Sequence, residues 1–195
     1  MKKFELIMAA VAIMTFGLFI KSNAQNQSAG LYLTYNDYLN NKLSYTMVDG
    51  SSNANKINLH EFLDGANVTV SSNGKKQVFA KNELFGYHDS NNNDCRFFNK
   101  EVYRIIDTTG FYIYTADKLV QQGKGFKAAK VYYFSKKGND EILTLTPENI
   151  AMAFPGNHMF RLMVDAEFKS GVNIGAYDQV SNNYKIKEIY TASLK

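Results

Sequence analysis

The side chains best suited to acid–base or nucleophilic chemistry gather in one short stretch that contains His88, Asp89, Asp94 and Cys95. A thiol becomes an effective nucleophile when an imidazole lies within hydrogen-bond reach. His88 and Cys95 are seven residues apart, so they can meet if they lie on neighbouring strands. We therefore take these four residues as the candidate catalytic group. The chain contains no G-x-S-x-G elbow, and nothing in the sequence positions a third catalytic group.

The polar run from Asp89 to Asp94 also resembles the start of a calcium loop, because oxygen ligands occupy alternate positions. Its sixth position is Asp94 where the sharp turn of such a loop needs Gly, and its twelfth is Lys100 where a bidentate Glu is required. Asn and Asp favour turns because they bond to their own backbone. With three His and one Cys in the whole chain, we predict a polar turn here and neither a metal site nor a cofactor.

Exposed aromatic side chains are one candidate for ligand binding. Tyr87, Tyr112 and Tyr114 lie in segments with strand character, and an alternating strand presents half of its rings on each face. Rings on the inner face belong to the core. Rings on the outer face would form a stacking surface for a glycan.

A basic cluster is the other candidate. Lys124, Lys127 and Lys130 fall in one loop, where they would attract an anionic polysaccharide or a lipid head group. Lysines on exposed strands and turns also prevent edge-to-edge pairing of sheets, so the cluster has a structural explanation as well.

The middle of the chain carries these residues on predicted β-hairpins. Val68–Val70 and Gln77–Ala80 flank Asn73-Gly74, a dipeptide that suits a type I′ turn because both residues tolerate positive φ. Further predicted strands are 84–88, 96–98, 101–107, 111–114, 130–135 and 141–145. Sequential hairpins indicate an antiparallel sheet from about residue 57 to 145.

Short helical turns are predicted to interrupt the sheet. Thr34 and Asp37 resemble a capping box for a helical turn over 34–41. A second helical turn is expected over 115–122, where it would stop at Gly123.

The last quarter of the chain has helical periodicity. Thr146 can cap a helix that has Pro147 at its first position and ends at Pro155. Asn157 can cap the next helix, and a final helix is expected over 184–192. The i, i+3, i+4, i+7 spacing predicts that the second of these helices buries Met159, Leu162, Met163 and Ala166. The fold class is therefore α+β, a twisted antiparallel sheet of sequential hairpins with C-terminal helices packed on it.

The N-terminus has the order of a secretory signal peptide. Lys2 and Lys3 precede an apolar run from Leu6 to Ile20, and a small residue, Ala24, follows. An uncleaved membrane anchor is the alternative, but the run is shorter than the roughly 20 residues that a spanning helix needs. We predict a signal peptide over 1–24 and a single domain over 25–195 that does not span the membrane.

Charge and cysteine content limit the partners. The formal net charge of +4 falls to +2 without residues 1–24, which hold three Lys and one Glu. Nucleic-acid recognition needs a concentrated basic face, so no nucleic-acid partner is expected. Cys95 is alone and cannot form an internal disulfide, and we interpret it as a buried small hydrophobe rather than a free thiol or an intermolecular link.

Several phrases of the chain resemble a family of small secreted proteins from Bacteroidota-type bacteria. These phrases are Gly30-Leu31-Tyr32-Leu33-Thr34, Gly86-Tyr87, Arg96-Phe97-Phe98-Asn99, Gly110-Phe111-Tyr112-Ile113-Tyr114 and Ala153-Phe154-Pro155. The resemblance implies export to the periplasm or outer surface, and it brings no activity and no site.

The sequence therefore favours an exported, non-enzymatic protein that binds a glycan or another component of the cell envelope. The alternatives are a small secreted hydrolase acting on polysaccharide or peptide through the His88–Cys95 stretch, and a structural subunit of an envelope assembly.

Overall fold

The architecture is that of a computed structural model, which describes residues 28–47, 55–60, 65–168 and 173–195. The predicted signal peptide lies outside these residues. The strands are β1 (Gly30–Tyr32), β2 (Lys56–Asn58), β3 (Asn67–Ser72), β4 (Lys75–Ala80), β5 (Gly86–His88), β6 (Asp94–Phe98), β7 (Glu101–Asp107), β8 (Tyr112–Gln122), β9 (Gly125–Ser135), β10 (Leu143–Thr144), β11 (Tyr177–Asp178) and β12 (Asn183–Tyr184). The helices are α2 (Tyr35–Leu39), α3 (Pro147–Ala153), α4 (His158–Phe168) and α5 (Lys185–Ala192), with one 3-10 turn, η1 (Lys81–Glu83).

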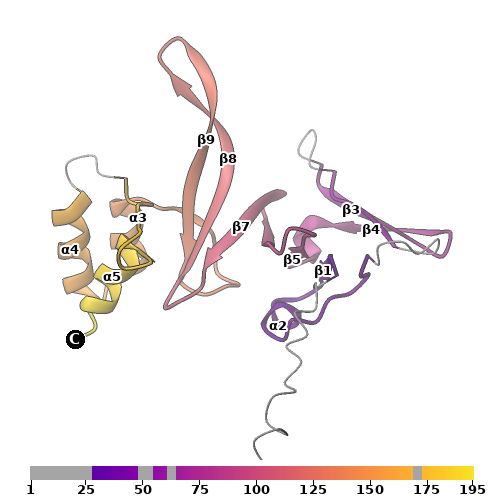
Figure 1. The fold of residues 1–195 in the computed structure, drawn as a ribbon, viewed down its shortest axis with the longest axis horizontal. Helices are drawn as coiled ribbons and strands as arrows, with labels where there is room; N and C mark the ends of the chain where they lie inside the picture. The colour runs from indigo at the N-terminus through magenta and orange to yellow at the C-terminus, as the bar shows by residue number, and fades with distance from the viewer. Residues whose placement is uncertain (1–27, 48–54, 61–64, 169–172) are drawn as a thin grey trace, which may run out of the picture.

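A large antiparallel sheet forms the centre of the molecule, with the strand order β1-β5-β6-β7-β8-β9-β10. The helices α3, α4 and α5 lie at the β8–β10 end of this sheet, and the smaller sheet β2-β3-β4 lies at the β1 end (Figure 1). The predicted α+β class is confirmed. The predicted continuous sheet from residue 57 is wrong in its extent, because β2, β3 and β4 form a sheet of their own and β1 joins the large one.

The register of the large sheet assigns its side chains to two faces. Gly86 pairs with Arg96 and His88 pairs with Asp94, so these side chains share one face, which continues through Tyr114 on β8. We call this the aromatic face. The opposite face, which we call the covered face, carries Leu31, Phe97, Ile113 and Phe134.

Two separate cores pack on the covered face. At the β8–β9 end, Ile113 and Phe134 contact buried residues of the three C-terminal helices, among them Ile150, Phe160 and Ile186. At the β1–β6 end, Leu31 and Phe97 instead contact Val68 and Val70 of the small sheet. Because both cores lie on one side, the aromatic face is left to α2 and to surface loops.

Several predicted elements are confirmed. The hairpin β3–β4 turns at Asn73 and Gly74 with φ of 50° and 75°. Thr34 and Asp37 form the capping box of α2, and Thr146 caps α3 with Pro147 in its first turn. The side-chain oxygen of Asn157 accepts from the backbone N–H of Phe160 at the start of α4, at 2.9 Å.

The predicted helical turn over 115–122 is wrong, because these residues extend β8. Their pairs with β9 run from Thr115–Tyr132 to Gln122–Gly125, around a two-residue turn in which Gly123 has a φ of 63°. Cross-strand pairing along the whole hairpin gives hydrogen-bond partners to backbone N–H and C=O groups that a short isolated helix would leave without partners. The end of this hairpin, residues 117–130, projects from the sheet as an arm (Figure 1).

The predicted buried face of α4 is wrong for three of its four residues, and Met163 alone of the four packs against the core. The buried residues are Phe160, Val164 and Phe168, whereas Met159 and Leu162 are 57% and 53% exposed. Both stripes have helical spacing, so periodicity does not distinguish them. The Phe160 ring packs 5.2 Å from Phe154 and 5.1 Å from Tyr190, measured between centroids, and this aromatic contact sets the rotation of the helix.

Candidate functional site

The sheet separates the two residues of the predicted thiol–imidazole pair. Tyr87 pairs with Cys95, and His88 pairs with Asp94, so Cys95 lies on the covered face and His88 on the aromatic face. Cys95 is 6% exposed, as its interpretation as a buried hydrophobe predicts. The interpretation of His88 and Cys95 as neighbours in one catalytic group is therefore wrong, because adjacent strand residues point to opposite sides.

His88 instead belongs to a hydrogen-bonded chain beneath α2. Its Nδ1 lies 2.8 Å from Oδ1 of Asp94, and the hydroxyl of Tyr32 donates to the same oxygen at 3.0 Å. His88 is 4% exposed, and its Nε2 has no hydrogen-bond partner among the described residues. Burial, followed by the charge of Asp94, raises the pKa of Tyr32 well above its ordinary range. The ring of Tyr38 covers Tyr32 edge-on at 5.4 Å. Tyr32 and His88 are therefore buried, while the Asp94 side chain that joins them is 30% exposed.

Asp89 organises the predicted polar turn. Its Oδ1 accepts the backbone N–H groups of Asn91 and Asn93, each at 2.8 Å, and its Oδ2 accepts the side-chain amide of Asn93. Burial acts to raise the pKa of the Asp89 carboxyl, but these hydrogen bonds outweigh it and lower that pKa. No cluster of three or more metal-ligating side chains occurs in the described part of the chain.

The three candidate tyrosines are positioned by the strands as structural residues. Tyr112 and Tyr114 are 9% and 0% exposed within a cluster on the aromatic face. Tyr87 is half-buried on the covered face, with its ring 5.5 Å from that of Phe97. The rings of Tyr112 and Tyr114 pack against protein, so they do not form the open stacking surface that strand alternation predicts. Tyr87 instead lines a small pocket of about 120 Å³ together with His88 and Asp89.

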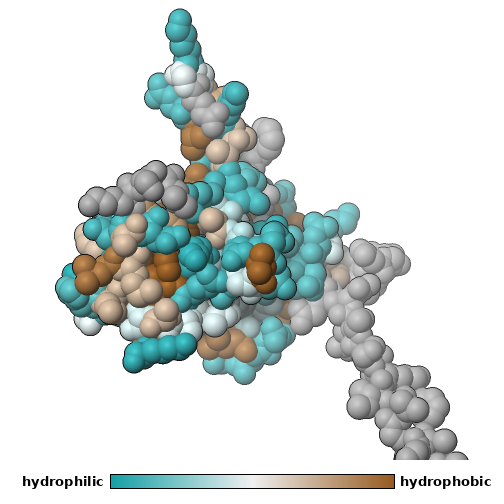
Figure 2. All heavy atoms as spheres, turned by 60° about the vertical axis from the view of Figure 1, so that its left-hand side comes forward, coloured by the Kyte–Doolittle hydropathy of each residue, from teal (hydrophilic) through white to brown (hydrophobic). Residues whose placement is uncertain are grey.

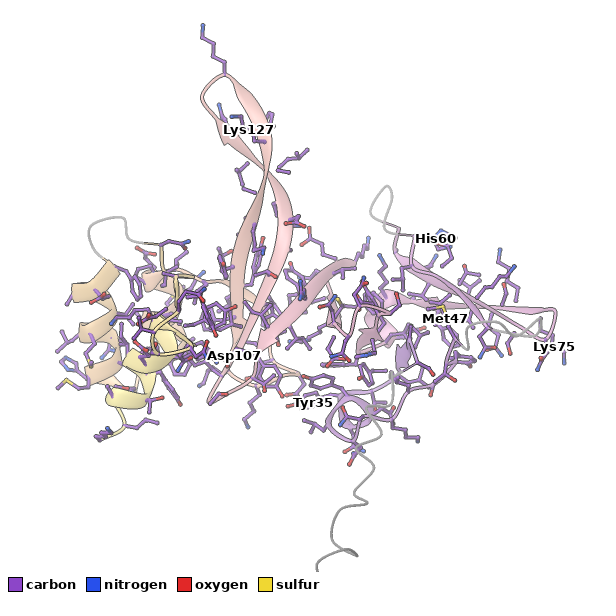
Figure 3. All side chains as sticks on the ribbon, in the orientation of Figure 1. Tyr35, Met47, His60, Lys75, Asp107 and Lys127 are labelled. Carbon is purple, nitrogen blue, oxygen red and sulfur yellow. The ribbon has the colours of Figure 1, made fainter. Side chains whose placement is uncertain are left out.

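The three candidate lysines are together on the arm. Lys124, Lys127 and Lys130 are all exposed, and Figure 3 shows Lys127 near the end of the arm, away from the sheet. Leu119 and Phe126 on the same arm are 73% and 70% exposed. In the space-filling view the arm stands clear of the rest of the molecule, hydrophilic toward its end and with apolar side chains below (Figure 2).

A cleft that sequence reasoning did not identify opens on the aromatic face, beside α2. Its volume is about 380 Å³, within the range of about 300–1,000 Å³ that is usual for small-molecule sites. We call it the Arg96 cleft. Its lining combines aromatic rings, amides and one guanidinium, supplied by Leu33, Thr34, Tyr35, Asn82, Glu83, Leu84, Phe85, Arg96, Phe97, Phe98, Asn99 and Asn139.

The capping box of α2 fixes one wall of the cleft. The Thr34 hydroxyl oxygen accepts from the N–H of Asp37 at 3.1 Å, which starts the helix so that Tyr35 faces the large sheet (Figure 3). The Tyr35 hydroxyl lies 3.0 Å from that of Tyr112. Tyr35 also contacts Phe85 with ring centroids 5.3 Å apart. A five-residue helix is marginal alone, so these contacts hold the wall in place.

Arg96 lines the cleft and is 5% exposed. Its Nη1 donates to the Tyr114 hydroxyl at 3.2 Å, and its Nη2 donates to the backbone carbonyl of Asp140 at 2.6 Å. Its Cζ lies 5.8 Å and 5.4 Å from the ring centroids of Phe85 and Phe98. An Arg between Cys95 and Phe97 in a strand was the available signal, because an Arg at an alternating inward position must find partners inside the fold.

Comparison with known proteins assigns neither a family nor a function, since no family model, no curated protein and no solved structure matches this chain. In the described part of the chain, every helix is too short or too polar to cross a membrane. The site consequently defines the molecule only as an α+β protein with a small aromatic and cationic cleft.

Proposed function

We propose that this chain is an exported, non-enzymatic protein of the cell envelope that binds a glycan or a similar polar ligand in the Arg96 cleft. The observation that carries the proposal is the composition of the cleft. The half-buried rings of Tyr35 and Phe98 offer apolar surfaces to the C–H faces of a sugar. The amides of Asn82 and Asn139 offer donors and acceptors to its hydroxyl groups.

Binding without catalysis is favoured over hydrolysis by the acidic residues available. Glycoside hydrolysis uses two carboxyl groups on either side of the scissile bond. Glu83 is the one acidic residue among the described lining residues, and its Oε2 accepts from the backbone N–H of Ala80 at 3.3 Å. The alternative hydrolase hypothesis also depended on His88 and Cys95, which the sheet separates.

The basic arm supports a second contact with the envelope. Lys124, Lys127 and Lys130 are exposed, and Lys127 lies far from Tyr35 of the cleft (Figure 3), so an anionic envelope component can bind to the arm without blocking the cleft. Contacts of this kind weaken as salt screens the exposed charges.

A screen for ligand-induced stabilisation tests the proposal, because a ligand that binds only the folded state raises the melting temperature. The purified full chain is screened against neutral and acidic mono- and oligosaccharides and peptidoglycan fragments. We expect a shift with at least one sugar class. The double variant N82A/N139A should lose that shift, and the matched control N36A/N67A, which removes two exposed amides outside the cleft, should keep it. Absence of any shift across the panel contradicts the proposal.

A further inference from the structure

The positive charge of Arg96 in the cleft is not neutralised by an acidic side chain of the described residues. Within the described residues, no Asp or Glu carboxylate lies within ion-pairing distance of the Arg96 guanidinium. Asp140 contacts Arg96 through its backbone carbonyl, and its own carboxylate accepts from the backbone N–H of Lys137 at 3.1 Å. The partners of Arg96 in the fold are therefore a hydroxyl, a carbonyl and aromatic rings, all of them uncharged.

Another buried cation of the same chain, Lys187, forms an ion pair with a carboxylate of the protein. Lys187 is 2% exposed, and its Nζ lies 2.9 Å from Oδ1 of Asp107. A buried charge is costly unless an opposite charge and hydrogen bonds compensate it. Lys187 has that compensation from the protein. The Arg96 side chain is also buried, at 5% exposure, but it lines an open cleft. A ligand that enters this cleft can supply the opposite charge.

We propose that the ligand of the Arg96 cleft is an acidic sugar whose carboxylate pairs with the Arg96 guanidinium. This inference rests on the proposed function and specifies its substrate class. A guanidinium has five N–H donors in a planar fork that matches a carboxylate. The contacts with Tyr114 and Asp140 hold the fork in one orientation, so little freedom is lost when the ligand binds.

The rest of the cleft selects a sugar rather than a bare anion. A free carboxylate such as acetate would engage Arg96 but leave the rings of Tyr35 and Phe98 and the amide of Asn139 unused. A sugar ring that carries a carboxylate uses all of them. Such a ring can be a free uronic acid or the end residue of an acidic polysaccharide, and the shared chemistry is the carboxylate on the ring.

Isothermal titration of the purified full chain at constant ionic strength tests this inference with four probes: galacturonic acid, its methyl ester, galactose and acetate. The ester has nearly the same shape as the acid and lacks its charge. We expect the acid to bind about 10- to 100-fold more tightly than the ester and galactose, the usual range for a hydrogen bond to a charged group. Acetate should bind more weakly than the acid. Trigalacturonide serves as a fifth probe, and tighter binding of it than of the monomer identifies a polymer end as the source.

Protein variants provide the second arm of the test. R96Q removes the charge inside the cleft, and R104Q removes an exposed charge on β7 outside it. We expect R96Q to abolish the preference for acid over ester and R104Q to retain it. The comparison of acid with ester in the unmodified protein decides the matter even if R96Q fails to fold.

The outcomes separate the two proposals. Equal affinity for acid, ester and galactose overturns the acidic-sugar inference and leaves the proposed glycan-binding function intact. Binding of acetate as tight as that of the acid also overturns it, because the sugar ring then contributes nothing. Failure of both the acidic and the neutral sugars of the full panel overturns both proposals.

Discussion

The hydroxyl of Tyr114 lies 3.2 Å from Nη1 of Arg96, and it links this guanidinium to the end of β9 on the same face of the sheet. The same hydroxyl lies 2.8 Å from Oγ of Ser135, which donates to the backbone carbonyl of Lys137 at 2.6 Å. One buried oxygen therefore connects β6, β8 and the loop that follows β9. The orientation of Arg96 in the cleft depends on this connection.

Replacing Tyr114 with Phe should destabilise the protein and disturb the cleft. The ring would remain, but Arg96 and Ser135 would each lose a buried partner, which costs about 1–3 kcal/mol of unfolding free energy. Chemical denaturation measures this loss. The matched variant Y133F alters a half-buried tyrosine on the neighbouring strand and should change the free energy by less than about 0.5 kcal/mol. Equal losses in the two variants would show that the hydroxyl of Tyr114 has no special role.

Replacing Gly86 with Ala should separate β5 from β6. An added Cβ would lie 1.9 Å from the carbonyl oxygen of Cys95 and 3.0 Å from Cα of Arg96. These are backbone atoms, so relief requires a strand to move, at a cost of about 1–3 kcal/mol. The control G125A adds a Cβ in β9 with nothing within 4 Å. Thermal unfolding should therefore distinguish the two, and similar melting temperatures would contradict the close approach of β5 and β6.

Tyr32, Tyr35, Tyr38 and Tyr112 form a tyrosine cluster around α2, and this cluster should make the protein sensitive to alkali. Burial, followed by the charge of Asp94, raises the pKa of Tyr38 to about 12. A tyrosine whose pKa is raised by folding contributes stability that is complete below its ordinary pKa of about 10 and is lost as the pH rises toward the folded value. Between about pH 10 and pH 12, the unfolding free energy of wild type should fall more steeply than that of Y38F. Titration of tyrosinate absorbance provides a direct check, because ordinary tyrosine titration in the folded protein would contradict the burial of the cluster.

The arm should contribute little to stability in spite of its apolar side chains. Leu119 and Phe126 are mostly exposed, so L119S/F126S should leave the unfolding free energy within about 0.5 kcal/mol of wild type. Ile113 lies on β8, the strand of Leu119, and is fully buried. I113A should therefore lower the unfolding free energy by about 2–5 kcal/mol. Denaturation in urea compares the two. A large loss in the arm variant would mean that the arm packs against the rest of the protein, contrary to its projecting position (Figure 2).

Local signals predicted much of the fold and almost nothing of the cleft. The Asn73-Gly74 turn and the caps at Thr34, Thr146 and Asn157 were correct, since each depends on the chemistry of a few adjacent residues. The helix predicted over 115–122 was wrong, because pairing with β9 outweighs local preference. The buried stripe of α4 was misplaced because two stripes have equal periodicity, and only the contact of Phe160 with Phe154 and Tyr190 selects one.

Short-range chemistry along the chain thus determined the α+β class, the hairpin turns and the helix starts, because turns and caps form between residues that are close in sequence. Tertiary structure decided which side chains meet. His88 pairs with Asp94 rather than with Cys95 because strand register fixes the face of every residue. Arg96 meets Tyr35, Phe85 and Asn139 in one cleft because α2 and three loops converge on a single face of the sheet, an arrangement that no local pattern specifies.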